Sequence, residues 1–207
     1  MKWNSLLILL VSFLCIVSCQ TKEKSDLLFE KYYEPESDYV DVVLKKFDYQ
    51  KPFELDSTMI TEDSMYYYNR KAVRIADLED LEKKRKEYFK ESLLTFKNKD
   101  FKEAYKRFEY YCATYFDSNI DHTVALYFKA KSNLNDGTID QSVVYDYEDF
   151  LQSKRLNQDM YNYGNFEMIL TMIKLKNPNA KGLLEATFGV RNHIKAAEIQ
   201  ELYKELE

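Results

Sequence analysis

The chain has no proline between Pro52 and Pro178, and its four glycines all lie at or beyond residue 137. Proline and glycine are the residues that most often interrupt helices, because proline lacks a backbone N–H and glycine loses the most conformational freedom on folding. Lys, Glu, Leu, Ala and Tyr fill the intervening tract. The sequence therefore predicts an all-α fold.

The first 18 residues have the layout of a secretory signal. One positive charge, Lys2, precedes an almost unbroken apolar run from Leu6 to Val17, and the small residue Ser18 follows. The run is shorter than the roughly 20 residues that a membrane-spanning helix needs. We expect residues 1–18 to be a cleaved signal peptide and not a permanent transmembrane anchor.

The end of this segment, Ile16-Val17-Ser18-Cys19, resembles the lipobox of bacterial lipoproteins. The resemblance implies that Cys19 is diacylated on its sulfur, that the chain is cut before it, and that the new amino group is acylated. The mature protein would then be held at a membrane surface by acyl chains without spanning the bilayer. The alternative is an ordinary signal that is cut elsewhere and leaves Cys19 free.

Cysteine and charge exclude several classes of protein. Cys15 would leave with the signal, so Cys112 is the remaining cysteine beyond Cys19, and we interpret it as a small buried apolar side chain. The net charge of −5 is modest and mixed in sign along the chain, with no basic block that would follow a phosphate backbone. We expect no nucleic-acid partner.

Residues 19–64 are predicted to form a lipid-anchored tether with one short helix. Asp26 to Tyr33 is the predicted helix, with Ser25 as its cap, and the rest is expected to be extended or irregular. Seven aromatic residues lie in this segment, which is unlike a purely solvated linker. We therefore expect part of it to pack on the helices.

Residues 65–207 are predicted to form a helical repeat domain. Apolar residues recur at helical spacing from about Met65 to Lys97, and the charged run Glu82 to Glu87 is interpreted as a solvated helix surface. Polar breaks separate the helices that follow. The predicted ranges are Phe101 to Tyr115, Thr123 to Leu134, Ile139 to Leu151 and, at the end, His193 to Leu206.

Three sets of residues recur at a spacing of 38. The sets are Phe96, Leu134 and Met172; Ala104, Ser142 and Ala180; and Cys112, Phe150 and Phe188. Helix, short turn, helix and longer turn form the repeating unit.

This unit resembles the tetratricopeptide repeat family. Asn98 to Ala104 is similar to the family's turn, and Asp136-Gly137 with Ile139 and Ser142 repeats it in weaker form. The family's usual tryptophan and closing proline are missing, and the period of 38 exceeds the family's 34. The resemblance implies a solenoid of about three antiparallel helix pairs, with the last helix as a cap.

The same resemblance implies a ligand groove lined by the first helix of each pair. The matching positions are Lys86, Phe89, Leu93, Tyr127 and Lys131. Two aromatic residues and two lysines in such a groove would suit an extended or acidic peptide.

No catalytic or metal-binding pattern stands out. Asp117, Asp121 and His122 could suggest metal ligands, but their position between helices favours a capping and turn cluster. His193 is interpreted as the start of the last helix. The chain carries no Gly-rich phosphate loop, paired zinc-ligand motif or nucleophile elbow. We expect no catalytic residue, no metal and no cofactor.

Clustered tyrosines offer two interpretations. Tyr66-Tyr67-Tyr68, Tyr110-Tyr111 and Tyr115-Phe116 could form a stacking platform for sugar or peptide. The interpretation that we favour is that most of them fill gaps between helices, because Leu and Val are scarce nearby.

The sequence thus predicts a non-enzymatic, membrane-anchored lipoprotein of the cell envelope that binds a protein or peptide. Its expected location is the outer membrane of a Gram-negative bacterium; the leaflet and the oligomeric state are open. One alternative is a structural accessory subunit of an envelope machine such as the outer-membrane β-barrel assembly complex. The least favoured alternative is a glycan-acting enzyme, since nothing singles out a carboxylate pair.

Overall fold

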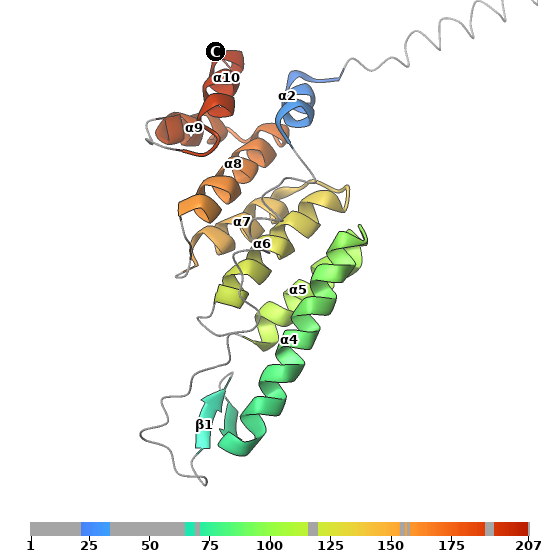
Figure 1. The fold of residues 1–207 in the computed structure, drawn as a ribbon. Helices are drawn as coiled ribbons and strands as arrows, with labels where there is room; N and C mark the ends of the chain where they lie inside the picture. Colours follow the sequence, from blue (N-terminus) through green and yellow to red (C-terminus); the bar gives the residue numbers. More distant parts are fainter. Residues whose placement is uncertain are drawn as a thin grey trace, which may run out of the picture.

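The computed structural model describes residues 22–33, 65–68, 71–115, 120–153, 156, 158–188 and 193–206. These residues are predominantly helical, which confirms the all-α class (Figure 1). The elements are α2 (Lys24–Tyr32), β1 (Met65–Tyr68), β2 (Lys71–Arg74), α4 (Ile75–Lys97), α5 (Phe101–Thr114), α6 (Ile120–Asn135), α7 (Gln141–Leu151), α8 (Gln158–Lys174), α9 (Ala180–Phe188) and α10 (Ala196–Leu206). The predicted signal peptide, 1–18, and most of the predicted tether lie outside the described residues.

A short β-hairpin stands where the sequence analysis predicted the start of a helix. β1 and β2 are antiparallel, with Met65 opposite Arg74 and Tyr68 opposite Lys71. Three consecutive tyrosines and Val73 have high strand propensity, and only two residues join the strands, as in the tightest hairpins. The helix therefore begins at Ile75 and not near Met65, which corrects the prediction.

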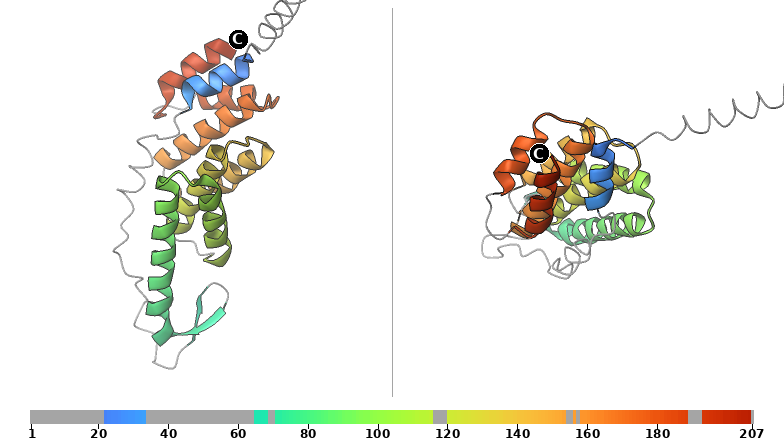
Figure 2. Two further views of the ribbon diagram at one scale, coloured as in Figure 1. Left: turned by 90° about the vertical axis from the view of Figure 1, so that its right-hand side faces the viewer. Right: turned by 90° about the horizontal axis from the view of Figure 1, so that it is seen from above.

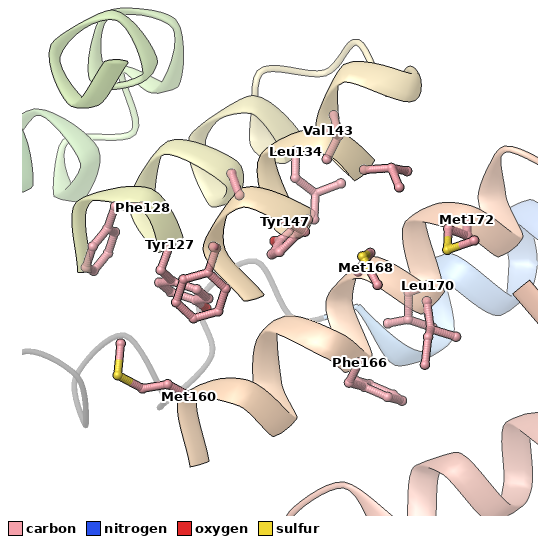
Figure 3. Close-up of a cluster of buried hydrophobic side chains, with 14 of the residues drawn as sticks. Tyr127, Phe128, Leu134, Val143, Tyr147, Met160, Phe166, Met168, Leu170 and Met172 are labelled. Carbon is pink, nitrogen blue, oxygen red and sulfur yellow. The ribbon is translucent and has the colours of Figure 1, made fainter. Parts of the chain in front are cut away.

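From α4 onward, each helix packs on the next helix along the chain, and Figure 1 shows them following one another from the hairpin to α10. The predicted helices after Lys97 are confirmed to within about three residues at their ends. The core is continuous through the middle of this array. Figure 3 shows buried side chains of α6, α7 and α8 pointing toward one another, including Tyr127, Tyr147 and Met168.

The turns after α4, α6 and α8 each contain a residue with positive φ. Lys99, Gly137 and Lys176 have φ values of 62°, 93° and 55°, and they are 38 and 39 residues apart. After α4, Asp100 N–H donates to Thr95 O (3.3 Å), and after α8, Asn177 N–H donates to Met172 O (2.8 Å). These bonds satisfy helix-terminal carbonyls as in the Schellman motif. The repeated spacing seen in the sequence thus has a counterpart in the backbone.

Acidic or amide side chains then start the following helices. The Asp100 carboxylate accepts from Glu103 N–H (3.3 Å) at the start of α5, and the Asp140 carboxylate accepts from Ser142 N–H (2.8 Å) at the start of α7. These bonds satisfy N–H groups that the first turn of a helix leaves unpaired. The polar breaks that end at Asp100 and Asp140 are therefore capped turns.

Helix α8 is covered on several sides by other helices. Nearly every residue from Asn162 to Ile173 is buried, because α8 packs against α2, α7 and α9. A helix covered on several sides is expected to be apolar around most of its circumference. Gly164 permits the close approach of α7: a Cβ built at this position would lie 2.3 Å from Cε1 of Phe150.

The short N-terminal helix exists and packs on the domain. It spans Lys24–Tyr32, close to the predicted range, and its Leu28, Phe29 and Tyr32 are buried. The predicted cap is wrong, because Glu23 occupies the N-cap position and makes no side-chain cap bond, while Ser25 lies inside the first turn. Figure 2 shows α2 beside α10 and over α8, at the opposite end of the molecule from the hairpin.

Candidate functional site

The structure places four of the five predicted groove residues in the interior. Phe89, Leu93, Tyr127 and Lys131 are 1%, 6%, 0% and 0% exposed, while Lys86 is half-buried. A side chain without exposed surface cannot contact a partner directly. The prediction that these four side chains line an open groove is therefore wrong.

The aromatic members of this set fill the space between helices. The Phe89 ring lies 5.1 Å from the ring of Tyr111 on α5, and the Tyr127 ring lies 5.4 Å from that of Phe150 on α7. Such distances are typical of favourable aromatic pairs in protein interiors. The first helix of each pair therefore uses these positions for packing.

Lys131 belongs to a buried cluster of charged and polar groups. Its ammonium forms an ion pair with Glu167 of α8, and the Tyr147 hydroxyl of α7 donates to Glu167 Oε2 (2.9 Å). The Lys131 Nζ also lies 4.4 Å from the centre of the Tyr33 ring, just after α2. The cluster thus joins four separate parts of the chain.

The two tyrosines of this cluster remain protonated at neutral pH. Burial, followed by the negative charge of Glu167, raises the pKa of Tyr147 and of Tyr33 well above the usual range. The Tyr33 hydroxyl donates to Asn135 Oδ1 on α6 (2.5 Å). A buried ion pair is tolerated only when hydrogen bonds and an opposite charge compensate for lost hydration. Here Glu167 supplies the charge opposite to Lys131, and Tyr147 supplies a hydrogen bond to Glu167.

Lys131 was predicted to line a groove, and no prediction linked it to Glu167, Tyr147 or Tyr33. One sequence pattern could have indicated this cluster. Glu167 is a single carboxylate within the apolar stretch from Phe166 to Ile173. An acidic residue in such a stretch needs a buried partner, because an unpaired buried charge is costly. A search for a lysine on a neighbouring helix could have found Lys131.

A second polar cluster joins α6 to α7 nearer the surface. The Asp146 carboxylate is buried and lies 2.7 Å from the ammonium of Lys129. Asn133 donates to the same carboxylate at 2.7 Å. All these groups are engaged with one another, so the cluster fixes the two helices and presents no reactive group.

The remaining candidates for chemistry are also in structural positions. Burial raises the pKa of the Cys112 thiol to about 12, so the nucleophilic thiolate is scarce at neutral pH. Burial lowers the pKa of His193, whose Nδ1 accepts from Lys195 N–H (3.0 Å) just before α10. Among the described residues, no cluster of His, Cys, Asp or Glu could hold a metal ion. Asp117 and the side chain of Asp121 lie outside the described part of the chain.

One aromatic patch is accessible on the surface of α4 and α5. Tyr110 is 54% exposed, and its ring centre lies 5.2 Å from that of the half-buried Tyr88. The Arg107 guanidinium lies 5.7 Å from the centre of the Tyr88 ring. We call Tyr88, Arg107 and Tyr110 the tyrosine–arginine patch. The neighbouring Tyr111 is fully buried, so the pair Tyr110-Tyr111 divides between surface and packing.

The predicted lipidation site, Cys19, lies outside the described residues. Within the described part of the chain, no helix combines the length and the apolar character that crossing a bilayer requires. Comparisons with protein-family models, curated proteins and solved structures gave no match to this chain.

Proposed function

We propose that the chain is a non-enzymatic lipoprotein, anchored through Cys19, that serves as a protein-binding helical-repeat scaffold in the cell envelope. The observation that carries the anchor is the lipobox-like Ile16-Val17-Ser18-Cys19 at the end of an apolar segment. The observation that carries the scaffold is the series of helices joined by recurring turns. The two roles are independent and are tested separately.

The recurring turns support tetratricopeptide-like organisation. Left-handed residues follow α4, α6 and α8 at nearly equal spacing, and α5, α7 and α9 are the second helices of the three pairs. The aligned residues Phe96, Leu134 and Met172 are all buried near the ends of the first helices. We propose three helix pairs, with α10 as the capping helix.

Buried ionisable groups support a non-enzymatic role. Glu167 binds both Lys131 and Tyr147 in the interior, and Asp146 binds both Lys129 and Asn133 between α6 and α7. Groups held in this way stabilise one arrangement of helices. General acid–base or nucleophilic catalysis instead needs such a group within reach of a substrate.

The tyrosine–arginine patch is the surface that we propose for partner contact. Tyrosine and arginine are enriched among the residues that contribute most to protein–protein binding. Tyr110 offers a large contact area, while Arg107 is held by Glu91 (3.3 Å) on the neighbouring helix. This patch replaces the buried groove positions as the proposed contact site.

Photo-crosslinking in intact cells tests the scaffold role. A benzophenone amino acid at Tyr110 should give a discrete protein adduct, and the same substitution at Tyr145, an exposed tyrosine on α7 (58% exposed), should not. Equal adducts at both positions, or none at Tyr110, would contradict the proposed contact surface. Adducts to an outer-membrane assembly complex would favour the accessory-subunit alternative.

Intact mass and labelling with a palmitate analogue test the anchor. The mature protein should begin at Cys19 and carry acyl chains, and Cys19→Ala should abolish the label and membrane association. An unacylated Cys19 would contradict the lipoprotein assignment while leaving the scaffold role open.

A further inference from the structure

The predicted anchor is very close to the folded domain. Only four residues separate Cys19 from Lys24, the first residue of α2. A fully extended chain spans at most about 3.6 Å per residue, so the five steps from Cys19 to Lys24 reach at most about 18 Å. This limit holds whatever conformation these residues adopt.

Helix α2 is itself attached to the body of the domain at several points. The Asp26 carboxylate lies 2.8 Å from Lys174 at the end of α8, and Glu23 forms an ion pair with Lys176 in the turn that follows. Near the other end of α2, Lys31 lies 2.5 Å from Glu205 of α10. The apolar residues Leu28 and Phe29 are buried beneath these contacts. An anchor at Cys19 would therefore be tied to a fixed end of the molecule.

The charge at the start of α2 and around the α8–α9 turn is close to balanced, whereas the whole chain is acidic. Segment 22–30 and the region from Lys174 into α9 contain more lysines than acidic residues, although the whole chain has a net charge of −5. The lysines are Lys22, Lys24, Lys174, Lys176 and Lys181, and the acidic residues are Glu23, Asp26, Glu30 and Glu185. Lys22, Lys174 and Lys176 form ion pairs with Glu30, Asp26 and Glu23. Anionic headgroups repel such a nearly neutral region less than they repel the acidic remainder of the chain.

We propose that the start of α2 and the α8–α9 turn face the lipid headgroups, and that the β1–β2 hairpin and the first half of α4 point away from the membrane. This orientation rests on the proposed anchor at Cys19. Figure 1 shows that α2 and the hairpin lie at opposite ends of the elongated array. A domain lying flat would bring its acidic parts against the same headgroups. The bilayer surface is thus the partner of the α2 end, and the tyrosine–arginine patch on α4 and α5 is free for a protein.

Spin labels at two exposed lysines test the orientation. The mature lipoprotein is reconstituted in vesicles of phosphatidylethanolamine and phosphatidylglycerol that contain a nickel-chelating lipid, in a Cys112→Ala background. A nitroxide is placed at Lys176→Cys, near the proposed membrane face, or at Lys83→Cys, an exposed position in the first half of α4. The nickel lipid should relax the label at 176 several-fold more strongly than the label at 83.

An inserted linker provides the control. Twelve Gly and Ser residues placed after Gln20 lengthen the reach of a flexible chain and should remove most of the difference between the two labels. Equal relaxation at 176 and 83 in acylated protein without the insertion would overturn the orientation. Missing acyl mass on Cys19 would instead contradict the proposed anchor, so the two failures are distinguishable.

Discussion

The buried Lys131–Glu167 cluster and the surface attachment of α2 use the same kinds of charges in opposite settings. Lys131 has no exposed surface, and its partner carboxylate also accepts from Tyr147. Lys31 and Glu205, in contrast, have side chains that are 52% and 37% exposed. A buried pair is costly to disrupt, whereas an exposed pair contributes little and is screened by salt. The Lys131–Glu167 cluster fixes how α6, α7 and α8 pack. The Lys31–Glu205 pair contributes to the stability of docked α2.

Removing one partner of the buried pair should have the largest effect. Glu167→Ala leaves the Lys131 ammonium buried without its counter-charge and should lower the free energy of unfolding by about 3–5 kcal/mol. Urea denaturation, followed by circular dichroism, measures this loss. The double variant Lys131→Met/Glu167→Met should recover most of it, because neither charge is then left unpaired.

The surface pair provides the matched control for that experiment. Glu205→Ala removes a carboxylate from an exposed ion pair and should change the free energy of unfolding only slightly. If Glu167→Ala were no more destabilising than Glu205→Ala, the contrast between the two settings would be wrong.

Close packing in the centre should give the next largest effect. Gly164→Ala forces a methyl group into the ring of Phe150 and should cost about 1–3 kcal/mol of unfolding free energy. Gly182→Ala, on the exposed side of α9 with nothing within 4 Å, should instead stabilise by up to about 1 kcal/mol, because alanine favours helix. Thermal unfolding of the two variants measures both signs, and shifts of the same sign would contradict this packing.

The smallest expected effect is that of acid, which should release α2 before it unfolds α8. The hydrogen bond from Lys174 lowers the pKa of Asp26, and the hydrogen bond from Lys31 lowers the pKa of Glu205, from their ordinary values of 3.8 and 4.5. A lowered carboxyl pKa stabilises the docked helix above the ordinary value, and this contribution is lost as the pH falls through the lowered one. Amide exchange, corrected for its intrinsic pH dependence, should show α2 losing protection while α8 retains it.

Removing the two carboxylates tests the cause of this pH dependence. In the double variant Asp26→Asn/Glu205→Gln, protection of α2 should be weaker at neutral pH and should change little on acidification. Simultaneous loss of protection in α2 and α8 of the unmodified chain would show that the two regions are not energetically separate.

The sequence predicted the helical part of the fold well, because the relevant information was local. The absence of proline and the polar breaks at Asn98–Asp100 and Asp136–Gly137 define helices and turns through nearest neighbours. The hairpin at Met65–Arg74 was missed because the spacing of its apolar residues also fits a helix. The strand propensity of Tyr66 to Tyr68 should have decided between them.

The candidate site was predicted less well, because burial depends on contacts between distant residues. The residues next to Lys131 in the sequence are those of an ordinary position on a helix surface. Only its ion-pair partner Glu167, 36 positions later, shows that Lys131 is buried. The burial of Tyr127 likewise depends on a distant residue, because its ring packs on Phe150 of the next helix. The predicted lipidation of Cys19 and the nature of the partner remain predictions that the proposed experiments address.

The contact between α2 and α10 has a consequence for biosynthesis. Lys31 and Glu205 are 174 residues apart, so the first described helix cannot complete its docking until the last helix has been made. Closing so long a segment is entropically unfavourable until the intervening helices have folded and brought its ends together. In a chain emerging from a ribosome, α2 can pack on α8 earlier, but its contact with α10 forms only when synthesis is almost finished.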